Sequence, residues 1–302
     1  MKLLAPGYYK SFACIADRCR HSCCVGWEID IDDAAMEKYA VLSKGYGKNV
    51  IKSIEAGDPP HFRLCEDERC PHLNERGLCR IIESLGEEYL CHICREHPRF
   101  YNDTPAGREA GLGLCCEEAC RIILSSDEYD RLSEIGETEG EPCAETTACR
   151  EEATRIRGMI FEILSDRSVP YTERLTQIYS ELSVSPSQLS DEEWRETLSS
   201  LEYLDKAHSA MFQSYTCELY TPKELEEPLE RALAYFLYRH LTKAEGLGGI
   251  LGAVGFSLFC ERLICSVVSE TGESVETVAR IVSEELEYCE ENTEEIQFCF
   301  LF

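Results

Sequence analysis

The stretch LERALAYFLYRHL, residues 229–241, decides the fold class. Its apolar residues recur at spacings of three and four, which is the period of a helix with one buried face. Two other segments, residues 153–164 and 275–286, repeat the pattern. The sequence therefore predicts a mainly α protein with a helical bundle in its second half. The positions that define the three faces are Leu229, Leu233, Phe236, Leu237 and Leu241; Ala153, Ile156, Ile160, Ile163 and Leu164; and Val275, Val278, Ala279, Val282 and Leu286.

Capping-box patterns, in which a Ser or Thr is followed three residues later by Glu, mark expected helix starts. They occur at residues 125–128, 190–193 and 221–224, and Pro222 suits the first helical position of the third. The uncharged run at residues 246–260 contains five glycines. It is shorter than the roughly 18 apolar residues of a membrane span, so we expect a buried core helix there. Its helical context also argues against a nucleotide-binding glycine loop.

Charge is spread unevenly along the chain. The 302 residues carry a net charge of -27, and 44% are hydrophobic, which is enough to build a core. Residues 1–125 hold 16 Lys and Arg against 20 Asp and Glu, a net of -4, so the remaining 14 and 37 give residues 126–302 a net of -23. Such acidity argues against binding nucleic acid and against docking on anionic lipid. We expect a Cys-rich metal-binding region at 1–125, a helix start and linker at 126–149, and an acidic α-helical region at 150–302.

The N-terminal region is distinguished by its cysteines, since twelve of the 19 lie in residues 1–125. The sequence MKLLAPGYYKSFAC, residues 1–14, lacks the apolar core of about 7–15 residues that a signal peptide needs. We therefore expect a cytoplasmic protein, in which thiols stay reduced and clustered cysteines bind metal more often than they form disulfides. In the same region, alternation over residues 27–31 predicts a short strand, and Asp32 is placed to cap a helix that begins near Asp33.

The cysteines of this region form three clusters along the sequence. Soft thiolates select zinc, Cu(I) or iron–sulfur clusters. Because only Cys91 and Cys94 have the Cys-x2-Cys spacing, the pattern favours a four-cysteine iron–sulfur cluster with spare thiols, or two metal centres, with zinc as the alternative. Histidines such as His72 lie among the thiols but are not needed to complete a coordination shell. The spacings are Cys14-x4-Cys19-x3-Cys23-Cys24; Cys65-x4-Cys70-x8-Cys79 followed by Cys91-x2-Cys94; and Cys115-Cys116-x3-Cys120.

Residues 12–32, FACIADRCRHSCCVGWEIDID, resemble the opening signature of the flagellin lysine N-methylase (FliB) family. A late stretch, SEELEYCEEN at 283–292, is similar to that family's Ser-Arg-x-(Ile/Phe)-Glu-His-Ser-x-Glu-Asn element, with Tyr288 and Cys289 in place of His-Ser. The N-terminal part also resembles the broader iron- or zinc-chelating family with a Cys-x2-Cys-x2-Cys-Cys pattern. Between these ends the similarity continues through RCPHLN at 69–74, GLC at 77–79, LGE at 85–87, Cys94, PRF at 98–100, Glu109 and LCCEEA at 114–119.

This resemblance implies methyl transfer from S-adenosylmethionine to lysine ε-amines of flagellin, with an iron–sulfur cluster, 4Fe-4S, in the cysteine region and zinc as the alternative. Glu109, in a glycine-rich stretch expected to be a loop, is the candidate general base or contact for the substrate amine. The cysteines that match the family, and so are the candidate ligands, are Cys14, Cys19, Cys23, Cys24, Cys70, Cys79, Cys94 and Cys116. The others are expected to be small buried residues: Cys65, Cys91, Cys115, Cys120, Cys143, Cys149, Cys217, Cys260, Cys265, Cys289 and Cys299.

Two classes of function stay open on the sequence. One is the cluster-dependent lysine methyltransferase, and the other is a non-catalytic iron- or zinc-binding module with a helical interaction platform. Flagellin is the expected partner, and the acidic runs at 224–227 and 284–287 are candidate contacts for its lysines. The sequence does not place the methyl donor, because no Gly-x-Gly fingerprint follows a strand.

Overall fold

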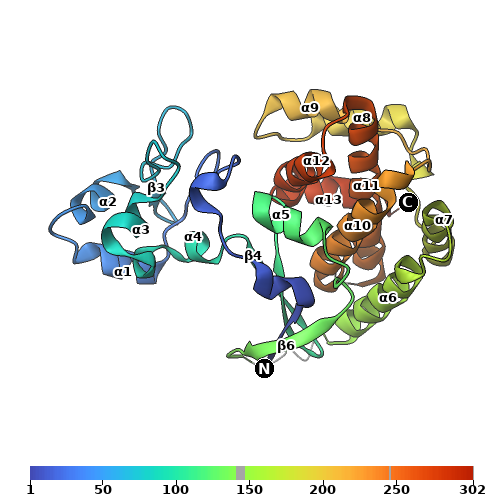
Figure 1. Ribbon diagram of the computed structural model, residues 1–302, viewed down its shortest axis with the longest axis horizontal. Helices are drawn as coiled ribbons and strands as arrows, with labels where there is room; N and C mark the ends of the chain where they lie inside the picture. The colour runs from blue at the N-terminus through green and yellow to red at the C-terminus, as the bar shows by residue number, and fades with distance from the viewer. Residues whose placement is uncertain (141–146, 245, 302) are drawn as a thin grey trace. The chain divides into compact units, whose positions relative to one another are not determined.

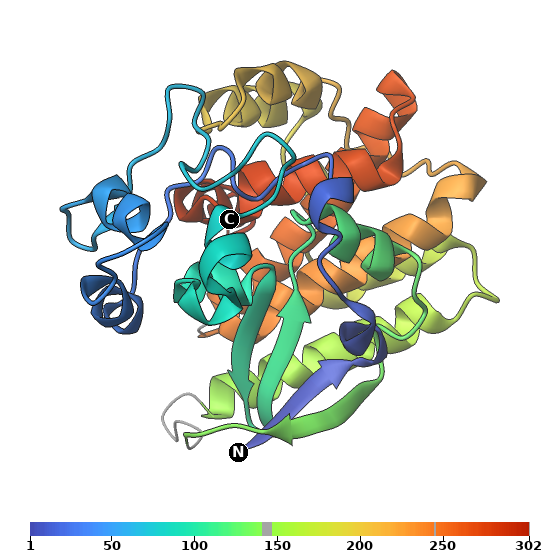
Figure 2. The ribbon, with the colours of Figure 1, turned by 60° about the vertical axis from the view of Figure 1, so that its left-hand side comes forward.

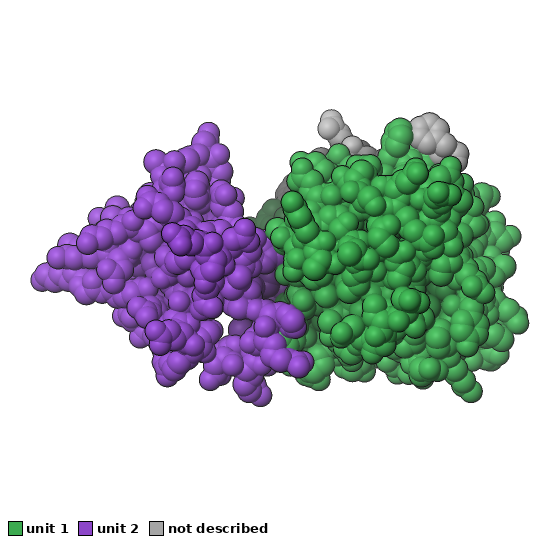
Figure 3. Space-filling view, turned by 90° about the horizontal axis from the view of Figure 1, so that it is seen from above, with its two compact units in different colours: residues 1–12, 100–302 green, residues 13–99 purple. Residues whose placement is uncertain are grey.

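The computed structural model describes residues 1–140, 147–244 and 246–301. It divides into two compact units, coloured separately in Figure 3: unit 1 contains residues 1–12 and 100–302, and unit 2 contains residues 13–99. Unit 2 is therefore one continuous segment within the chain of unit 1. The division expected from the sequence, at residue 125, differs from these bounds. It groups the third cysteine cluster with the first two, whereas the structure places the third cluster in unit 1.

Unit 1 begins with a four-stranded sheet in the order β4-β5-β1-β6, whose strands lie side by side in Figure 2. The first strand, β1, is parallel to β5 and antiparallel to β6, with Leu4 opposite Glu109 on one side and Glu134 on the other. This pairing ties the chain's first residues to the segment that follows unit 2. The strands are β1 (Lys2–Pro6), β4 (Arg99–Thr104), β5 (Gly107–Leu112) and β6 (Leu132–Glu137).

The rest of unit 1 is helical, as the sequence predicts, and the molecule is mainly α (Figure 1). All three predicted apolar faces lie in its core, with Ile163 partly buried. The helices are α5 (Glu117–Leu124), α6 (Thr147–Ser165), α7 (Tyr171–Leu182), α8 (Asp191–Ser200), α9 (Lys206–Phe212), α10 (Glu226–His240), α11 (Gly246–Thr271), α12 (Val275–Val282) and α13 (Glu290–Phe298), with a π-helical turn, η8 (Ser283–Glu287), after α12.

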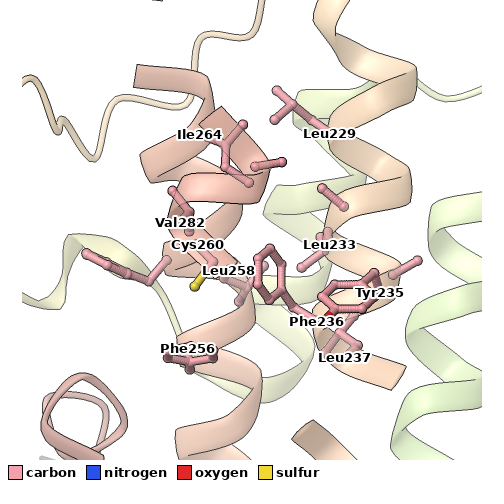
Figure 4. Close-up of a cluster of buried hydrophobic side chains, with 14 of the residues drawn as sticks. Leu229, Leu233, Tyr235, Phe236, Leu237, Phe256, Leu258, Cys260, Ile264 and Val282 are labelled. Carbon is pink, nitrogen blue, oxygen red and sulfur yellow. The ribbon is translucent and has the colours of Figure 1, made fainter. Parts of the chain in front are cut away.

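Helix α11 is the centre of this core. Side chains of α10 such as Phe236 face α11 residues such as Phe256 and Cys260 in Figure 4. By length and composition α11 would suit a membrane span, but 94% of its most apolar window is buried inside the structure. The expected buried core helix is confirmed and continues to Thr271. Its glycines admit close neighbours, since a Cβ on Gly255 would lie 2.2 Å from the ring of Phe300.

Unit 2 has short elements around a small apolar core of its own. Asp32 caps α1 as predicted, with its carboxylate accepting from the Ala35 amide at 3.0 Å. The core is built from residues such as Tyr39, Val50 and Phe62. The elements are α1 (Asp33–Ala40), α2 (Gly47–Ser53), α3 (Arg80–Leu85), α4 (His92–Glu96), β2 (Ile54–Glu55) and β3 (His61–Phe62).

Some local predictions are wrong. Residues 27–31 form one isolated bridge, between Asp30 and His61, rather than a strand, although Ile29 and Ile31 are buried. Ser190 forms a complete capping box. Ser125, in contrast, is the C-cap of α5 and starts no helix. Near Thr221 a helical turn does begin, at Lys223, but Pro222 is its N-cap, and the Thr221 hydroxyl accepts a hydrogen bond from buried Arg262. The predicted linker contains β6, and its residues 141–146, including Cys143, lie outside the described residues.

Candidate functional site

Five thiols gather in the core of unit 2, and we call them the thiol group: Cys24, Cys70, Cys79, Cys91 and Cys94. Their side chains interact electrostatically with one another. Cys70 and Cys91 are buried, and the other three are half-buried against the same apolar cluster. Residues that are 70 positions apart in the chain, from 24 to 94, therefore meet in one place.

Backbone contacts hold the thiol group together. The Cys70 amide donates to the Cys24 carbonyl at 2.8 Å, next to a bridge between Val25 and Arg69. Cys79 and Cys91 are the residues that cap α3 and α4. The second oxygen of Asp32 accepts from the His92 amide at 2.5 Å, so the residue that caps α1 also fixes the start of α4. Cys79 and Cys91 are thus positioned by the starts of helices and Cys94 lies within α4, whereas Cys24 and Cys70 are joined by a backbone hydrogen bond.

The thiols differ in acidity. A hydrogen bond with the Cys23 side chain lowers the pKa of Cys24 to about 7. Burial raises the pKa of Cys70 to about 12 and also raises the pKa of Cys79. The sulfurs of Cys91 and Cys94 lie 3.4 Å apart, and the hydrogen bond between them lowers the pKa of Cys91 and raises the pKa of Cys94. A metal that binds here must displace protons from the buried thiols.

The donor chemistry of the thiol group fits a soft metal or an iron–sulfur centre. Across residues 1–140, 147–244 and 246–301, however, no three His, Cys, Asp or Glu side chains are arranged to hold a single metal ion. His72 is not a candidate ligand, because its two ring nitrogens already bond Tyr46 at 2.9 Å and Ser53 at 2.8 Å. The thiols therefore match a soft metal in their donor chemistry, and thiolates would be the ligands.

The remaining candidate ligands lie outside the thiol group. Cys14 and Cys23 are exposed, although the Cys23 side chain hydrogen-bonds that of Cys24, and the Cys19 thiol donates to the His21 carbonyl at 3.2 Å. Cys116 belongs to unit 1. Cys91, which the sequence predicts to be a buried residue and not a ligand, is buried, and it also lies in the group. Its two-residue separation from Cys94 is the signal that identifies it.

In unit 1 the third cysteine cluster meets the late element of the sequence. The thiol of Cys115, just before α5, hydrogen-bonds the hydroxyl of Tyr288, which follows η8. Tyr288 also accepts from Arg239 at 3.2 Å, and the guanidinium of Arg239 packs on the rings of Tyr288 and Phe100. Two segments that resemble the same family thus contact each other within one unit.

Glu287 is the centre of a buried polar network beside this contact. Its carboxylate accepts from the Tyr235 hydroxyl at 3.0 Å, from the Ser283 hydroxyl and from His240 Nε2 at 2.6 Å. Burial by itself would raise the pKa of Glu287, but Arg239 and His240 outweigh burial and hold it below its usual value. The wide π-helical turn directs this carboxylate inward, and such turns are frequent at functional sites.

Glu109 occupies a strand rather than the expected loop. It lies in β5, its side chain is 2% exposed, and its two oxygens accept from the Arg157 guanidinium at 2.6 and 2.7 Å. This geometry commits both oxygens to one internal partner. A substrate amine would have to displace Arg157 in order to reach them.

The acidic runs are not uniform exposed faces. In the run at 284–287, Glu285 and Glu287 are buried, so that run does not present a row of carboxylates to a partner. Glu285 accepts from the amides of Leu204 and Asp205. In the run at 224–227, Glu227 pairs with Arg231 at 2.8 Å and remains largely exposed. Only this second run keeps the exposure that a docking surface needs.

A shallow pocket of about 190 Å³ lies elsewhere in unit 1, between residues 214–220 and α11. Glu218, Glu270, Tyr220 and Cys265 are among the residues that line it. None of the site residues expected from the sequence lines this pocket, so the pocket is separate from the predicted site.

Comparison with known proteins gives three relatives. The chain is 31% identical over 143 residues to proteins named lysine-N-methylase from Salmonella typhimurium and Salmonella choleraesuis, covering 43% of this chain and 34% of each relative. It is 26% identical over 136 residues to flagellar biosynthetic protein FliU of Salmonella muenchen, covering 43% of this chain and 80% of that one. The chain thus matches about a third of the length of the curated lysine-N-methylases. No family model and no solved structure matches. These relatives confirm the resemblance to the flagellin lysine N-methylase family that the motifs indicate.

Proposed function

From this relationship we propose that the protein is a lysine N-methyltransferase, which moves methyl groups from S-adenosylmethionine to lysine ε-amines of flagellin. The observation that carries the proposal is the 31% identity with two lysine-N-methylases over 43% of this chain. The thiol group supports the further proposal that the activity depends on an iron–sulfur cluster, because its five cysteines belong to one apolar core.

The chemistry sets two demands on the protein. Lysine titrates near ~10.4, so its ammonium must lose a proton before the nitrogen can attack the methyl carbon. The donor is a sulfonium cation, which carboxylates and aromatic faces attract. Cys24, Cys70, Cys79, Cys91 and Cys94 are the residues that would hold a cluster. When bound, a cluster supplies iron whose reduction potential is set by its thiolate ligands and their hydrogen bonds.

Co-expression with flagellin tests the activity. We expect mass spectrometry to find methyl-group mass increments on flagellin lysines when the wild-type protein is present and none when it is absent. The matched variants are Cys70→Ser, from the thiol group, and Cys260→Ala, which removes a buried thiol of unit 1 that lies outside it. We expect Cys260→Ala to retain methylation and Cys70→Ser to lose it. Flagellin without methyl-lysine beside abundant folded wild-type protein would refute the proposal.

Metal analysis of the same variants tests the cluster. We expect Cys70→Ser and Cys94→Ser to lower the amount of bound iron, because each removes a thiolate that would hold the cluster. Cys260→Ala should leave the bound iron unchanged. A visible absorption band distinguishes an iron–sulfur protein from a zinc protein. Equal iron loss in both groups of variants would show that the thiol group is not the site.

The second candidate function is a non-catalytic iron- or zinc-binding module with a helical interaction platform. It is favoured by the location of the thiol group in a separate compact unit, residues 13–99. This alternative predicts stoichiometric metal and binding to a partner, with unmodified lysines in the co-expression experiment.

A further inference from the structure

A histidine and a glutamate form a close pair inside unit 1. His240 is the last residue of α10, and its Nε2 lies 2.6 Å from Oε1 of Glu287, the last residue of η8. The Glu287 side chain is fully buried and that of His240 is 10% exposed. The ring of Phe256 packs edge-on against the imidazole, with centroids 4.8 Å apart. The orientation of the imidazole is therefore fixed from two sides.

This pairing sets which nitrogen carries the proton. An ionised carboxylate only accepts hydrogen bonds, so Nε2 of His240 is the donor and the lone pair of the neutral ring lies on Nδ1. Within the described residues Nδ1 makes no hydrogen bond. The pair thus holds a proton-accepting nitrogen without a hydrogen-bond partner among the described residues, on a side chain that is 10% exposed.

Burial, together with two nearby cations, keeps the ring neutral. The charged groups that face it are Glu287 from η8, Arg239 from α10 and Lys243 from the turn after α10. Burial lowers the pKa of His240 below its ordinary value of 6.5, and the two cations act in the same direction, while Glu287 opposes them. At neutral pH the imidazole is therefore unprotonated and ready to accept.

Another glutamate of η8, Glu285, pairs with a histidine of α9 and serves as a comparison. His208 Nδ1 lies 2.5 Å from Glu285 Oε1, but Glu285 also accepts from the backbone amides of Leu204 at 2.8 Å and Asp205 at 3.1 Å. That pair holds a backbone turn. The pair of Glu287 instead belongs to the network of Arg239, Tyr235 and Tyr288 that reaches Cys115.

We propose that His240, oriented by Glu287 as a positioning residue, accepts the proton of the substrate lysine. This inference rests on the proposed methyl transfer, for which it names the base. The lysine ε-ammonium gives its proton to Nδ1, and the nitrogen lone pair then attacks the methyl carbon of the sulfonium donor. The bond between carbon and sulfur breaks with its electron pair left on sulfur, and the imidazolium returns its proton to solvent.

Steady-state kinetics of the full-length protein with S-adenosylmethionine and a lysine-bearing flagellin peptide test the proposal. We expect His240→Gln to lower kcat by about 100-fold, in the range of general-base catalysis, and His208→Gln to leave it unchanged. Wild-type kcat should fall as the pH drops through the lowered pKa of His240, and this limb should vanish in His240→Gln. Added imidazole should restore activity to a folded His240→Gly variant. Wild-type kcat in His240→Gln, or a folded His240→Gly variant that imidazole does not rescue, would overturn the inference.

A readout that needs no turnover separates this inference from the proposed function. The NMR signals of the His240 imidazole should shift when the lysine peptide is added to the wild-type protein, whereas those of His208 should not. If methyl transfer is absent but the His240 signals shift, the methyltransferase proposal fails and the pair remains an ammonium-binding site. If the His240 signals do not respond, the inference fails whatever the activity.

Discussion

The buried ion pair of Glu109 and Arg157 joins strand β5 to helix α6. The two side chains are 2% and 6% exposed, and the Arg157 guanidinium in α6 donates one hydrogen bond to each oxygen of the Glu109 carboxylate in β5. Removing one partner of such a pair leaves a charge buried alone, which costs much more than the pair itself contributes. Glu109 therefore joins the sheet to a helix, whatever further part it takes.

We predict that Arg157→Met lowers the free energy of unfolding by about 3–5 kcal/mol, because the Glu109 carboxylate then stays buried without its partner. The double variant Glu109→Leu with Arg157→Met should recover much of that loss, since neither charge remains. Urea denaturation followed by circular dichroism measures both. If the single variant were as stable as the wild type, Glu109 would have an alternative partner and would be available for other roles.

At this scale the sequence predicts residue types better than partners. Spacing and resemblance locate Cys24, Cys70, Cys79 and Cys94, which do come together, but miss Cys91, because the family pattern does not require a cysteine there. The partner of Glu109 lies 48 positions away on a different element, and no local pattern indicates such a contact. Similarly, the acidic run at 284–287 looks exposed in sequence, whereas a π-helical turn directs two of its carboxylates inward.

At the scale of elements, apolar periodicity identifies the helices and the glycines of α11 explain how they pack. A Cβ on Gly255 would meet the ring of Phe300, and one on Gly252 would lie 3.2 Å from Gln297. These glycines let the C-terminal segment approach α11 closely. Capping patterns predict helix starts less reliably than apolar periodicity does. Ser190 starts a helix, because an apolar face follows it, whereas Ser125 stands at the end of α5 and starts none.

A pair of glycine variants separates helix propensity from packing. We predict that Gly255→Ala destabilises the protein by about 1–3 kcal/mol, because the added methyl group overpacks the contact with Phe300. Gly158→Ala, in the exposed part of α6 where an added Cβ meets nothing, should instead stabilise by up to about 1 kcal/mol through helix propensity. Thermal unfolding of both variants gives the two signs. Stabilisation by Gly255→Ala would show that the C-terminal segment does not pack against α11 in this way.

At the scale of the whole molecule, the chain of unit 1 is interrupted by unit 2. The sequence could not reveal this, because β1 pairs with β5 and β6, which lie more than a hundred positions later, and such pairing depends on tertiary contacts. The helical content of the second half was predictable from local period alone. Unit 2 has only short helices and a small core, so its stability is expected to depend on a bound metal.

We predict that gentle chelation of the metal-loaded protein leaves most of the helical circular dichroism signal, because the large helices belong to unit 1 and need no ligand to bury their faces. Amide hydrogen exchange should rise across residues 13–99 and change little across residues 147–244 and 246–301. A complete loss of helical signal on chelation would mean that both units unfold as one cooperative structure.

We propose that this molecule methylates lysine and that its thiol group holds the cluster on which the reaction depends. The most direct measurement is tandem mass spectrometry of flagellin after anaerobic incubation with the purified protein and S-adenosylmethionine labelled in its methyl group. We predict labelled methyl groups on lysine with the cluster-loaded wild-type protein, and none with Cys70→Ser or with protein stripped of metal. Unlabelled lysines after incubation with the loaded protein, or equal labelling by loaded and stripped protein, would contradict the claim.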